Sequence, residues 1–134
     1  MRYTFLLDTN AFSDIISPRG ITARERFRRA SLNSVCISSI TLGEFEYGMA
    51  LKPDATRKAR QASLLLEQVG LLSWTAETAA VYGKLRAEMH RLGKALGSLD
   101  MLIAAQALEI GATLVTSDRA FRYVPSLAVE DWRA

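Results

Sequence analysis

Four acidic residues are the main candidates for catalysis or metal binding in this sequence: Asp8, Glu44, Asp100 and Asp118. Asp8 and Asp118 each follow an apolar run that is typical of a buried strand, so both are expected at the carboxyl ends of strands. Glu44 lies in the first turn of a predicted helix that directly follows another such run. In a parallel sheet these positions meet at one edge, where open α/β sheets bind their ligands. The sequence therefore predicts an acidic crevice at that edge.

Asp100 is not placed by this rule, because its predicted helix precedes a strand instead of following one. It is the lone acid near the start of a helix, residues 99–110, that is apolar on nearly all sides and is therefore expected to be central and buried. The structural alternative for Asp100 is stabilisation of the helix dipole by an acid in the first turn. For Glu44 the alternative is a capping box with Thr41, and Ser39 is another candidate cap.

Carboxylates that converge repel one another and raise each other's pKa, so a cluster of them calls for cations. A donor set of oxygens without histidine or cysteine favours a hard ion, Mg²⁺ or Mn²⁺. Such an ion generates hydroxide from water and stabilises the charge on a phosphoryl group during its transfer. The chain has no CxxC or HxxxH spacing, which argues against structural zinc.

The elements that must position these acids alternate along the chain. Strands are predicted at residues 3–7, 34–38, 71–74, 113–116 and 127–129, and helices at residues 11–17, 22–32, 41–51, 55–69, 76–92 and 99–110. Thr75 and Ser98 are the predicted caps of the last two helices, and Gly111 is the predicted stop of the final one. The alternation predicts an α/β fold with a central parallel sheet of about five strands. Residues 1–134 are expected to form one domain, because no linker or repeat interrupts the pattern.

Composition narrows the class of protein further. The 134 residues are 49% hydrophobic and 23% charged, an ordinary globular composition without an apolar run long enough to span a bilayer. The start of the chain lacks the basic-then-apolar layout of a signal peptide. The single cysteine, Cys36, rules out an internal disulfide and is expected to be a core residue, not a nucleophile. We therefore expect a cytoplasmic protein that makes no membrane contact.

The basic residues gather in three clusters, around residues 19–29, 52–60 and 84–94, and the net charge is +3. Any one cluster alone is best explained as a solvated helix face. Around an acidic metal pocket, however, basic helices could hold a polyanionic backbone over the ions. The basic clusters and the acidic pocket together therefore favour binding of a nucleic acid, which neither feature would indicate alone.

The order and spacing of several segments resemble the PIN-domain ribonucleases, and specifically the VapC toxins of bacterial toxin–antitoxin pairs. The resemblance covers essentially the whole chain. Its segments are Phe5-Leu6-Leu7-Asp8-Thr9-Asn10, Ile37-Ser38-Ser39-Ile40-Thr41 with Glu44, Gly97-Ser98-Leu99-Asp100 with residues 102–105, Leu114-Val115-Thr116-Ser117-Asp118, and the ending Val129-Glu130-Asp131-Trp132. It implies a three-layer α/β/α PIN domain with helices on both faces of the sheet.

Carried over position by position, the resemblance implies roles for individual side chains. The four acids match the residues that bind Mg²⁺ or Mn²⁺ in that family. The polar residues expected to surround them are Asn10, Ser39, Thr116 and Ser117, the last of which stands where many relatives have asparagine. Arg86 matches a basic position that is common in VapC chains, and it is expected to contact RNA together with Lys94.

The resemblance also implies an activity and partners. The activity is metal-dependent cleavage inside single-stranded RNA, usually a tRNA or a ribosomal RNA loop, which inhibits translation. The partners are a second copy of the chain and a VapB-type antitoxin whose C-terminal segment occupies the active-site groove, in a toxin–antitoxin hetero-oligomer.

Two alternatives remain open: a catalytically silent RNA-binding module, and another acid-dependent phosphatase or nuclease. A haloacid-type phosphatase would need a second acid where Asn10 stands. A signalling receiver domain would need an acid at the end of the 71–74 strand, which has none.

Overall fold

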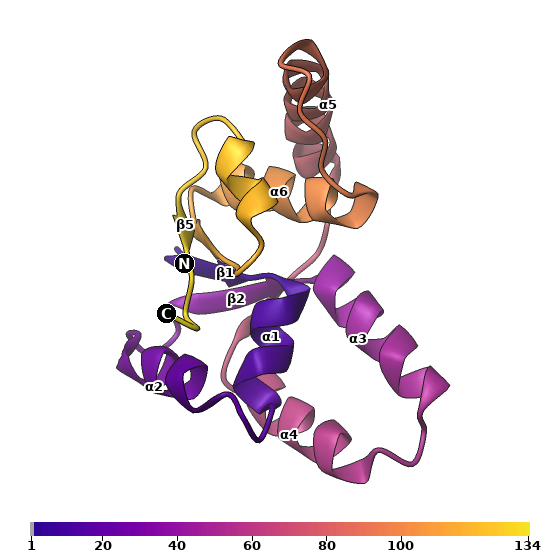
Figure 1. Ribbon diagram of the computed structural model, residues 1–134, viewed down its shortest axis with the longest axis vertical. Helices are drawn as coiled ribbons and strands as arrows, with labels where there is room; N and C mark the ends of the chain where they lie inside the picture. Colours follow the sequence, from indigo (N-terminus) through magenta and orange to yellow (C-terminus); the bar gives the residue numbers. More distant parts are fainter. Residues whose placement is uncertain (1) are drawn as a thin grey trace.

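A parallel sheet of five strands runs through the middle of residues 2–134, the part of the chain that the computed structural model describes (Figure 1). The strands are β1 (Phe5–Leu7), β2 (Val35–Ser38), β3 (Gly70–Leu72), β4 (Thr113–Val115) and β5 (Val129–Glu130), in the order β3-β2-β1-β4-β5. The central strand is β1, and its last residue, Leu7, pairs in register with Ile37 of β2 and Val115 of β4. The carboxyl ends of these strands therefore lie side by side, as predicted.

Helices cover both faces of the sheet, so the predicted three-layer α/β/α architecture is confirmed (Figure 1). On one face lie α1 (Thr9–Ile16), α2 (Ile21–Arg29), α3 (Ser39–Leu51) and α4 (Thr56–Leu66), and on the other lie α5 (Ala76–Arg91), α6 (Ser98–Ile110) and the short 3-10 helix η1 (Arg119–Tyr123). Among the described residues, no helix combines the length and the apolar character that crossing a bilayer requires.

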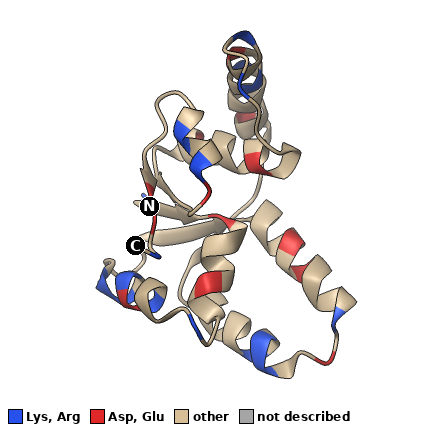
Figure 2. Cartoon of the chain, in the orientation of Figure 1, with Lys and Arg blue, Asp and Glu red and all other residues tan. Residues whose placement is uncertain are grey.

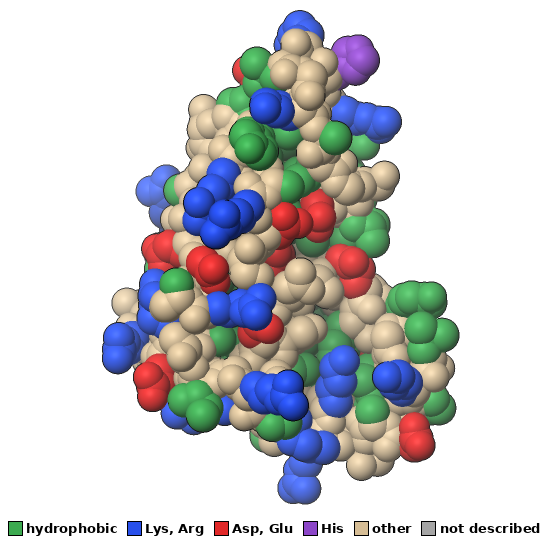
Figure 3. Space-filling view, viewed as in Figure 1, with side chains coloured by type: hydrophobic (Ala, Val, Ile, Leu, Met, Phe, Trp, Pro, Cys, Tyr) green, Lys and Arg blue, Asp and Glu red, His purple; other side chains and the backbone are tan. Residues whose placement is uncertain are grey.

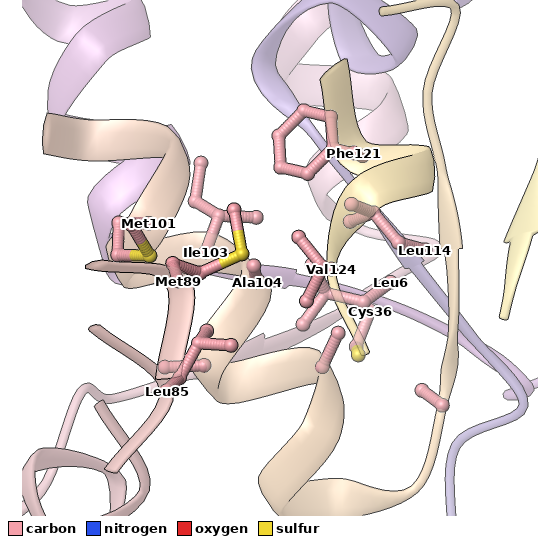
Figure 4. Packing of buried hydrophobic residues seen from close by; sticks show 13 residues of the cluster. Leu6, Cys36, Leu85, Met89, Met101, Ile103, Ala104, Leu114, Phe121 and Val124 are labelled. Atoms are coloured by element: carbon pink, nitrogen blue, oxygen red, sulfur yellow. The ribbon is translucent and has the colours of Figure 1, made fainter. Parts of the chain in front are cut away.

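The strands supply a hydrophobic core on each side of the sheet, because successive strand residues face opposite ways. Leu6 and Leu114 pack in the core beneath α5, α6 and η1, which Figure 4 shows, whereas Leu7 and Val115 pack in the core beneath α1–α4. Cys36 is fully buried in the first core, and burial raises the pKa of its thiol to about 12. Its predicted role as a core residue is therefore confirmed.

The beginnings of two helices differ from the prediction. α3 is capped by Ser38, whose Oγ accepts a hydrogen bond from the backbone N–H of Ile40 at 3.0 Å. The predicted caps Thr41 and Ser39 are therefore wrong, because β2 runs directly into the helix and leaves only its own last residue with extended backbone. Ser98 is also wrong as a cap, because it is already the first residue of α6.

The sequence does not predict η1, which follows Asp118 and connects β4 to β5. A single 3-10 turn carries no hydrophobic periodicity from which it could be recognised. It is held to the molecule by Phe121, which is fully buried. Two other predicted helix ends are confirmed: Thr75 caps α5 in a capping box, and Gly111 ends α6 in the left-handed conformation with a φ of 69°.

Candidate active site

Asp8 connects the central strand to the first helix and is almost completely buried, with 3% of its surface exposed. It is the N-cap of α1: its Oδ1 accepts a hydrogen bond from the backbone N–H of Ala11 at 2.7 Å. The pKa of the Asp8 carboxyl is raised to about 6, mainly by burial; hydrogen bonds from Thr116 and Ala11 lower it, and the negative charges of Asp100 and Asp14 add to the rise. The fold thus holds a carboxylate where an isolated negative charge is unfavourable.

Glu44 lies in the second turn of α3, not in the first as predicted, because the helix begins at Ser39. The residue next to Asp8 holds the Glu44 side chain near Asp8. The Oγ1 hydroxyl of Thr9 donates a hydrogen bond to Oε1 of Glu44, with 2.5 Å between the two oxygens. Charge-assisted hydrogen bonds of this type are short and strong. The sequence does not identify this role of Thr9, because its partner is distant along the chain and only the pairing of β1 with β2 brings the two together.

Asp100 lies in the first turn of α6 and is half-buried. Its pKa is raised first by burial and then by the negative charges of Asp118 and Glu44. The negative charge of Asp100 in turn raises the pKa of Asp8. Asp100 therefore interacts electrostatically with all three other acids. The residue that the sequence places least firmly is therefore the one that lies among the rest.

Asp118 follows β4 after two further residues, Thr116 and Ser117, and its side chain is exposed to solvent. It caps η1, because its Oδ1 accepts a hydrogen bond from the backbone N–H of Ala120 at 2.9 Å. Its own backbone N–H donates to Oγ1 of Thr116 at 3.0 Å. Thr116 is buried and contacts both acids, so one hydroxyl connects the turn that follows β4 to the carboxylate that follows β1.

The four acids therefore come from four different elements and meet at the carboxyl edge of the sheet. Figure 2 shows acidic positions at the start of α1, near the start of α6 and before η1, and Figure 3 shows acidic side chains gathered in the middle of this face with basic side chains beside them. The donors are all oxygens, which suits a hard divalent ion. Within residues 2–134, no three His, Cys, Asp or Glu side chains are close enough, as they stand, to hold a metal ion. Binding of an ion by the four carboxylates would therefore require their side chains to turn inward.

Comparison with known proteins decides the family. The sequence model of the PIN domain matches residues 5–127. This chain belongs to the PIN-domain family.

Within that family its relatives are VapC proteins, and the chain belongs with them. It is 34% identical over 129 residues to a tRNA(fMet)-specific endonuclease VapC from Shigella flexneri, an alignment that covers 96% of this chain and 97% of the relative. It is 33% identical over 104 residues to Ribonuclease VapC2 from Rickettsia felis, which covers 77% of this chain and 78% of the relative. A chain in the crystal structure of DNA-bound VapBC from Salmonella typhimurium superposes with a TM-score of 0.89 and 33% identity, covering 97% of this chain and 98% of that one.

The polar residues that the VapC resemblance places around the acids make contacts of different kinds. Asn10 is exposed in the first turn of α1, two residues after Asp8. Ser39 accepts a hydrogen bond from the backbone N–H of Trp74 at 3.2 Å, which fastens the start of α3 to the chain after β3. The contact of Ser39 is therefore with the backbone of a neighbouring segment, whereas Thr9 and Thr116 are the hydroxyls that hydrogen-bond to acids.

Three other residues predicted for this VapC-family site, Ser117, Arg86 and Lys94, have side-chain contacts near the surface. Ser117 accepts a hydrogen bond from Nη1 of Arg133 at 3.2 Å. Arg86, on α5, donates from Nη1 to the hydroxyl of Tyr82 at 2.8 Å. Lys94 lies in the connection between α5 and α6, with its Nζ 4.3 Å from the centre of the Tyr123 ring. Both predicted RNA-binding cations are thus exposed and next to tyrosines.

Proposed function

We propose that this chain is the toxin of a toxin–antitoxin pair, and that it cuts RNA internally with the help of Mg²⁺ or Mn²⁺. The observation that carries the proposal is the meeting of Asp8, Glu44, Asp100 and Asp118 at one edge of the sheet, with Asp100 electrostatically coupled to the other three. Such mutual repulsion is relieved when a cation binds. The raised pKa of the buried Asp8 carboxyl is typical of a functional acid.

The four acids would hold the ion, and neighbouring hydroxyls would fix their orientation. Thr9 holds Glu44, and Thr116 holds Asp8. When bound, a divalent ion lowers the pKa of water and offsets the charge that develops on a phosphate during cleavage. The residues of this chain would supply the negative charge that attracts the ion and the carboxylates that follow β1 and β4.

The substrate that we propose is a tRNA, with a ribosomal RNA loop as the alternative, so that cleavage inhibits translation. A relative that matches 96% of this chain is named as a tRNA(fMet)-specific endonuclease, which favours tRNA. The site itself discriminates less, because four carboxylates and an ion act on a phosphodiester of any RNA that reaches them.

We propose a VapB-type antitoxin and a second copy of this chain as partners, acting together in the cytoplasm. Structural neighbours of this chain come from VapBC complexes of Salmonella typhimurium and Rickettsia felis. The chain also exposes large apolar side chains on α3, where Tyr47 is 68% and Leu51 64% exposed. Apolar surface of this kind is typical of protein contacts.

The test is cleavage of purified tRNA by the chain after release from its co-expressed antitoxin. We expect internal cuts with Mg²⁺ or Mn²⁺ and none with EDTA. Asp100→Asn should remove cleavage, because it takes away the charge that is coupled to the other acids. The matched control is Asp54→Asn, which changes an exposed acid in the loop between α3 and α4 and should cut like the parent.

Three outcomes separate the alternatives. Cleavage that survives EDTA, or that Asp100→Asn leaves intact, contradicts the metal site. RNA binding without any cleavage by the parent identifies a catalytically silent module. Hydrolysis of a phosphomonoester in preference to RNA identifies another acid-dependent phosphatase.

A further inference from the structure

The short helix η1 lies between the acidic site and an exposed surface, and its backbone is anchored at several points. It begins directly after Asp118, which caps it, and its middle residue, Phe121, is fully buried in the core beneath α5 and α6. Val124, just after it, is 3% exposed. The outward side chains of η1 are Arg119, Arg122 and Tyr123. Because the helix is fixed at its start, middle and end, these side chains are held at a set distance from the acids.

The two arginines of η1 are charges without a protein partner. Among the described residues, neither Arg119 nor Arg122 makes a side-chain hydrogen bond or an ion pair, whereas Arg26 pairs with Glu130 at 3.2 Å. Both arginines line a small pocket of about 100 Å³ together with Asp118 and Thr116 of the acidic site. Figure 2 shows the two basic positions on the short helix directly beyond the acid that precedes it. Two cations without an ion pair among the described residues therefore lie at the border of the acidic site, in a pocket that Asp118 and Asp131 also line.

Tyr123 adds an aromatic surface beside these cations. Its side chain is 56% exposed, although it is one of the largest apolar groups on this part of the molecule. The Nζ of Lys94 lies 4.3 Å from its ring centre, so a third positive charge stands at the same place. An exposed ring among unpaired cations is the arrangement with which proteins bind single-stranded nucleic acid, whose bases stack on aromatic rings while its phosphates pair with basic groups.

We propose that η1 is a docking surface for the RNA strand next to the phosphate that is cut. On this surface Arg119 and Arg122 pair with backbone phosphates, and Tyr123 stacks on a base, with Lys94 as the third cation. The inference rests on the proposed function, because it takes the acids beside η1 as the cutting site. RNA fits better than an acidic peptide, because it brings flat bases for the exposed ring of Tyr123 as well as phosphates for Arg119 and Arg122.

The test measures RNA binding with cleavage switched off. All variants are made in the Asp8→Asn background, and binding of a labelled single-stranded RNA is followed by fluorescence anisotropy without divalent ions. Loss of one stacked base corresponds to roughly 5- to 150-fold weaker binding, so Tyr123→Ala should weaken binding by about tenfold. Tyr123→Phe keeps the ring and should bind within about twofold of the parent. The control is Leu32→Ala, which removes a large side chain that is 87% exposed between α2 and β2 and should have no effect.

The arginines are tested by the salt dependence of the same binding. Each lost phosphate contact lowers the slope of log K against log salt by about 0.7 for single strands, so the double variant Arg119→Gln, Arg122→Gln should lower it by about 1.4. The control double variant, Arg28→Gln with Arg29→Gln on α2, removes the same charge from exposed positions far along the chain and should leave the slope closer to that of the parent.

The outcomes separate this inference from the proposed function. If the parent cuts RNA but the η1 variants bind RNA as their parent does, the docking surface is wrong and the ribonuclease stands. If the η1 variants lose antitoxin binding while RNA binding is unchanged, η1 is a protein contact and the inference is again wrong. If RNA binds through η1 but the intact chain never cuts it, the proposed function fails while the surface stands.

Discussion

Asp8 and Asp118 both follow neighbouring parallel strands and both cap the next helix, yet their surroundings differ. Each follows the last residues of a parallel strand, and each caps the next helix by accepting a backbone hydrogen bond, at 2.7 Å for Asp8 and 2.9 Å for Asp118. Asp8 is 3% exposed and has a raised pKa of about 6, whereas Asp118 is open to solvent. The comparison shows that a position at the carboxyl edge of a sheet brings acids together. Burial then decides which of them has a raised pKa.

The first way to test this comparison is to neutralise each acid in turn. Asp8→Asn should reduce Mg²⁺-dependent RNA cleavage by about 1,000-fold, because a fixed charge inside a buried site is worth the upper end of what single electrostatic groups supply. Asp118→Asn should reduce it by about 10- to 100-fold, because solvent and neighbouring acids replace part of an exposed group. The measurement is the single-turnover rate at pH 7.5. Equal losses of cleavage rate in the two variants would show that burial does not determine how much each acid contributes to cleavage.

The second prediction concerns stability without metal. Asparagine also caps helices, so Asp8→Asn removes the charge but keeps the cap. The pKa of Asp8 is about 6 in the folded chain, above the ordinary value of 3.8 for an aspartate, so the folded state holds the proton more tightly. The parent should therefore lose roughly 2 to 3 kcal/mol of unfolding free energy as pH rises from about 4 to above 6, and Asp8→Asn should not.

Urea unfolding in EDTA at several pH values measures this effect. At pH 7, Asp8→Asn should be more stable than the parent, whereas Asp118→Asn should lie within about 0.5 kcal/mol of it, as exposed substitutions usually do. A difference between the parent and Asp8→Asn that does not change with pH would mean that the charge of Asp8 carries no penalty in the fold.

The smallest effect is expected from changing Thr116, whose hydroxyl lies between the two acids. Thr116 lowers the pKa of Asp8 by a side-chain hydrogen bond and accepts one from the backbone N–H of Asp118. Thr116→Val should therefore raise the pKa of Asp8, shift the acidic limb of the cleavage–pH profile upward and slow cleavage by about tenfold. Thr116→Ser should restore the profile. An unshifted acidic limb in Thr116→Val would break the proposed link between the two strand ends.

Much of this architecture could be predicted from the sequence, because the strands alternate with helices and end in recognisable residues. Asp8, Glu44 and Asp118 could be assigned to one edge by the rule that parallel strands share a carboxyl edge. The position of Asp100 depends on how α6 packs across the sheet, and no local pattern carries that information. The same limit hides the hydrogen bond from Thr9 to Glu44, which exists only once β1 and β2 are paired.

Other features were beyond prediction for local reasons. Ser38, Ser39 and Thr41 are all small hydroxyl residues that cap helices well, and only the point at which β2 stops selects Ser38. The helix η1 has a single turn, so its arginines and its tyrosine read as an ordinary loop in the sequence. Sequence periodicity identifies long helices and strands. The surface that we propose for RNA is formed by η1, which is too short to be identified in this way.

The cap made by Asp8 has a genetic consequence. Aspartate and asparagine codons differ by one base, and either side chain can accept the hydrogen bond from Ala11. A cell harmed by this chain could thus escape through a point mutation that silences the site and leaves a folded, even more stable, protein. Such an allele would keep the outer surfaces of the molecule and could still sequester the antitoxin that an active copy needs for its control.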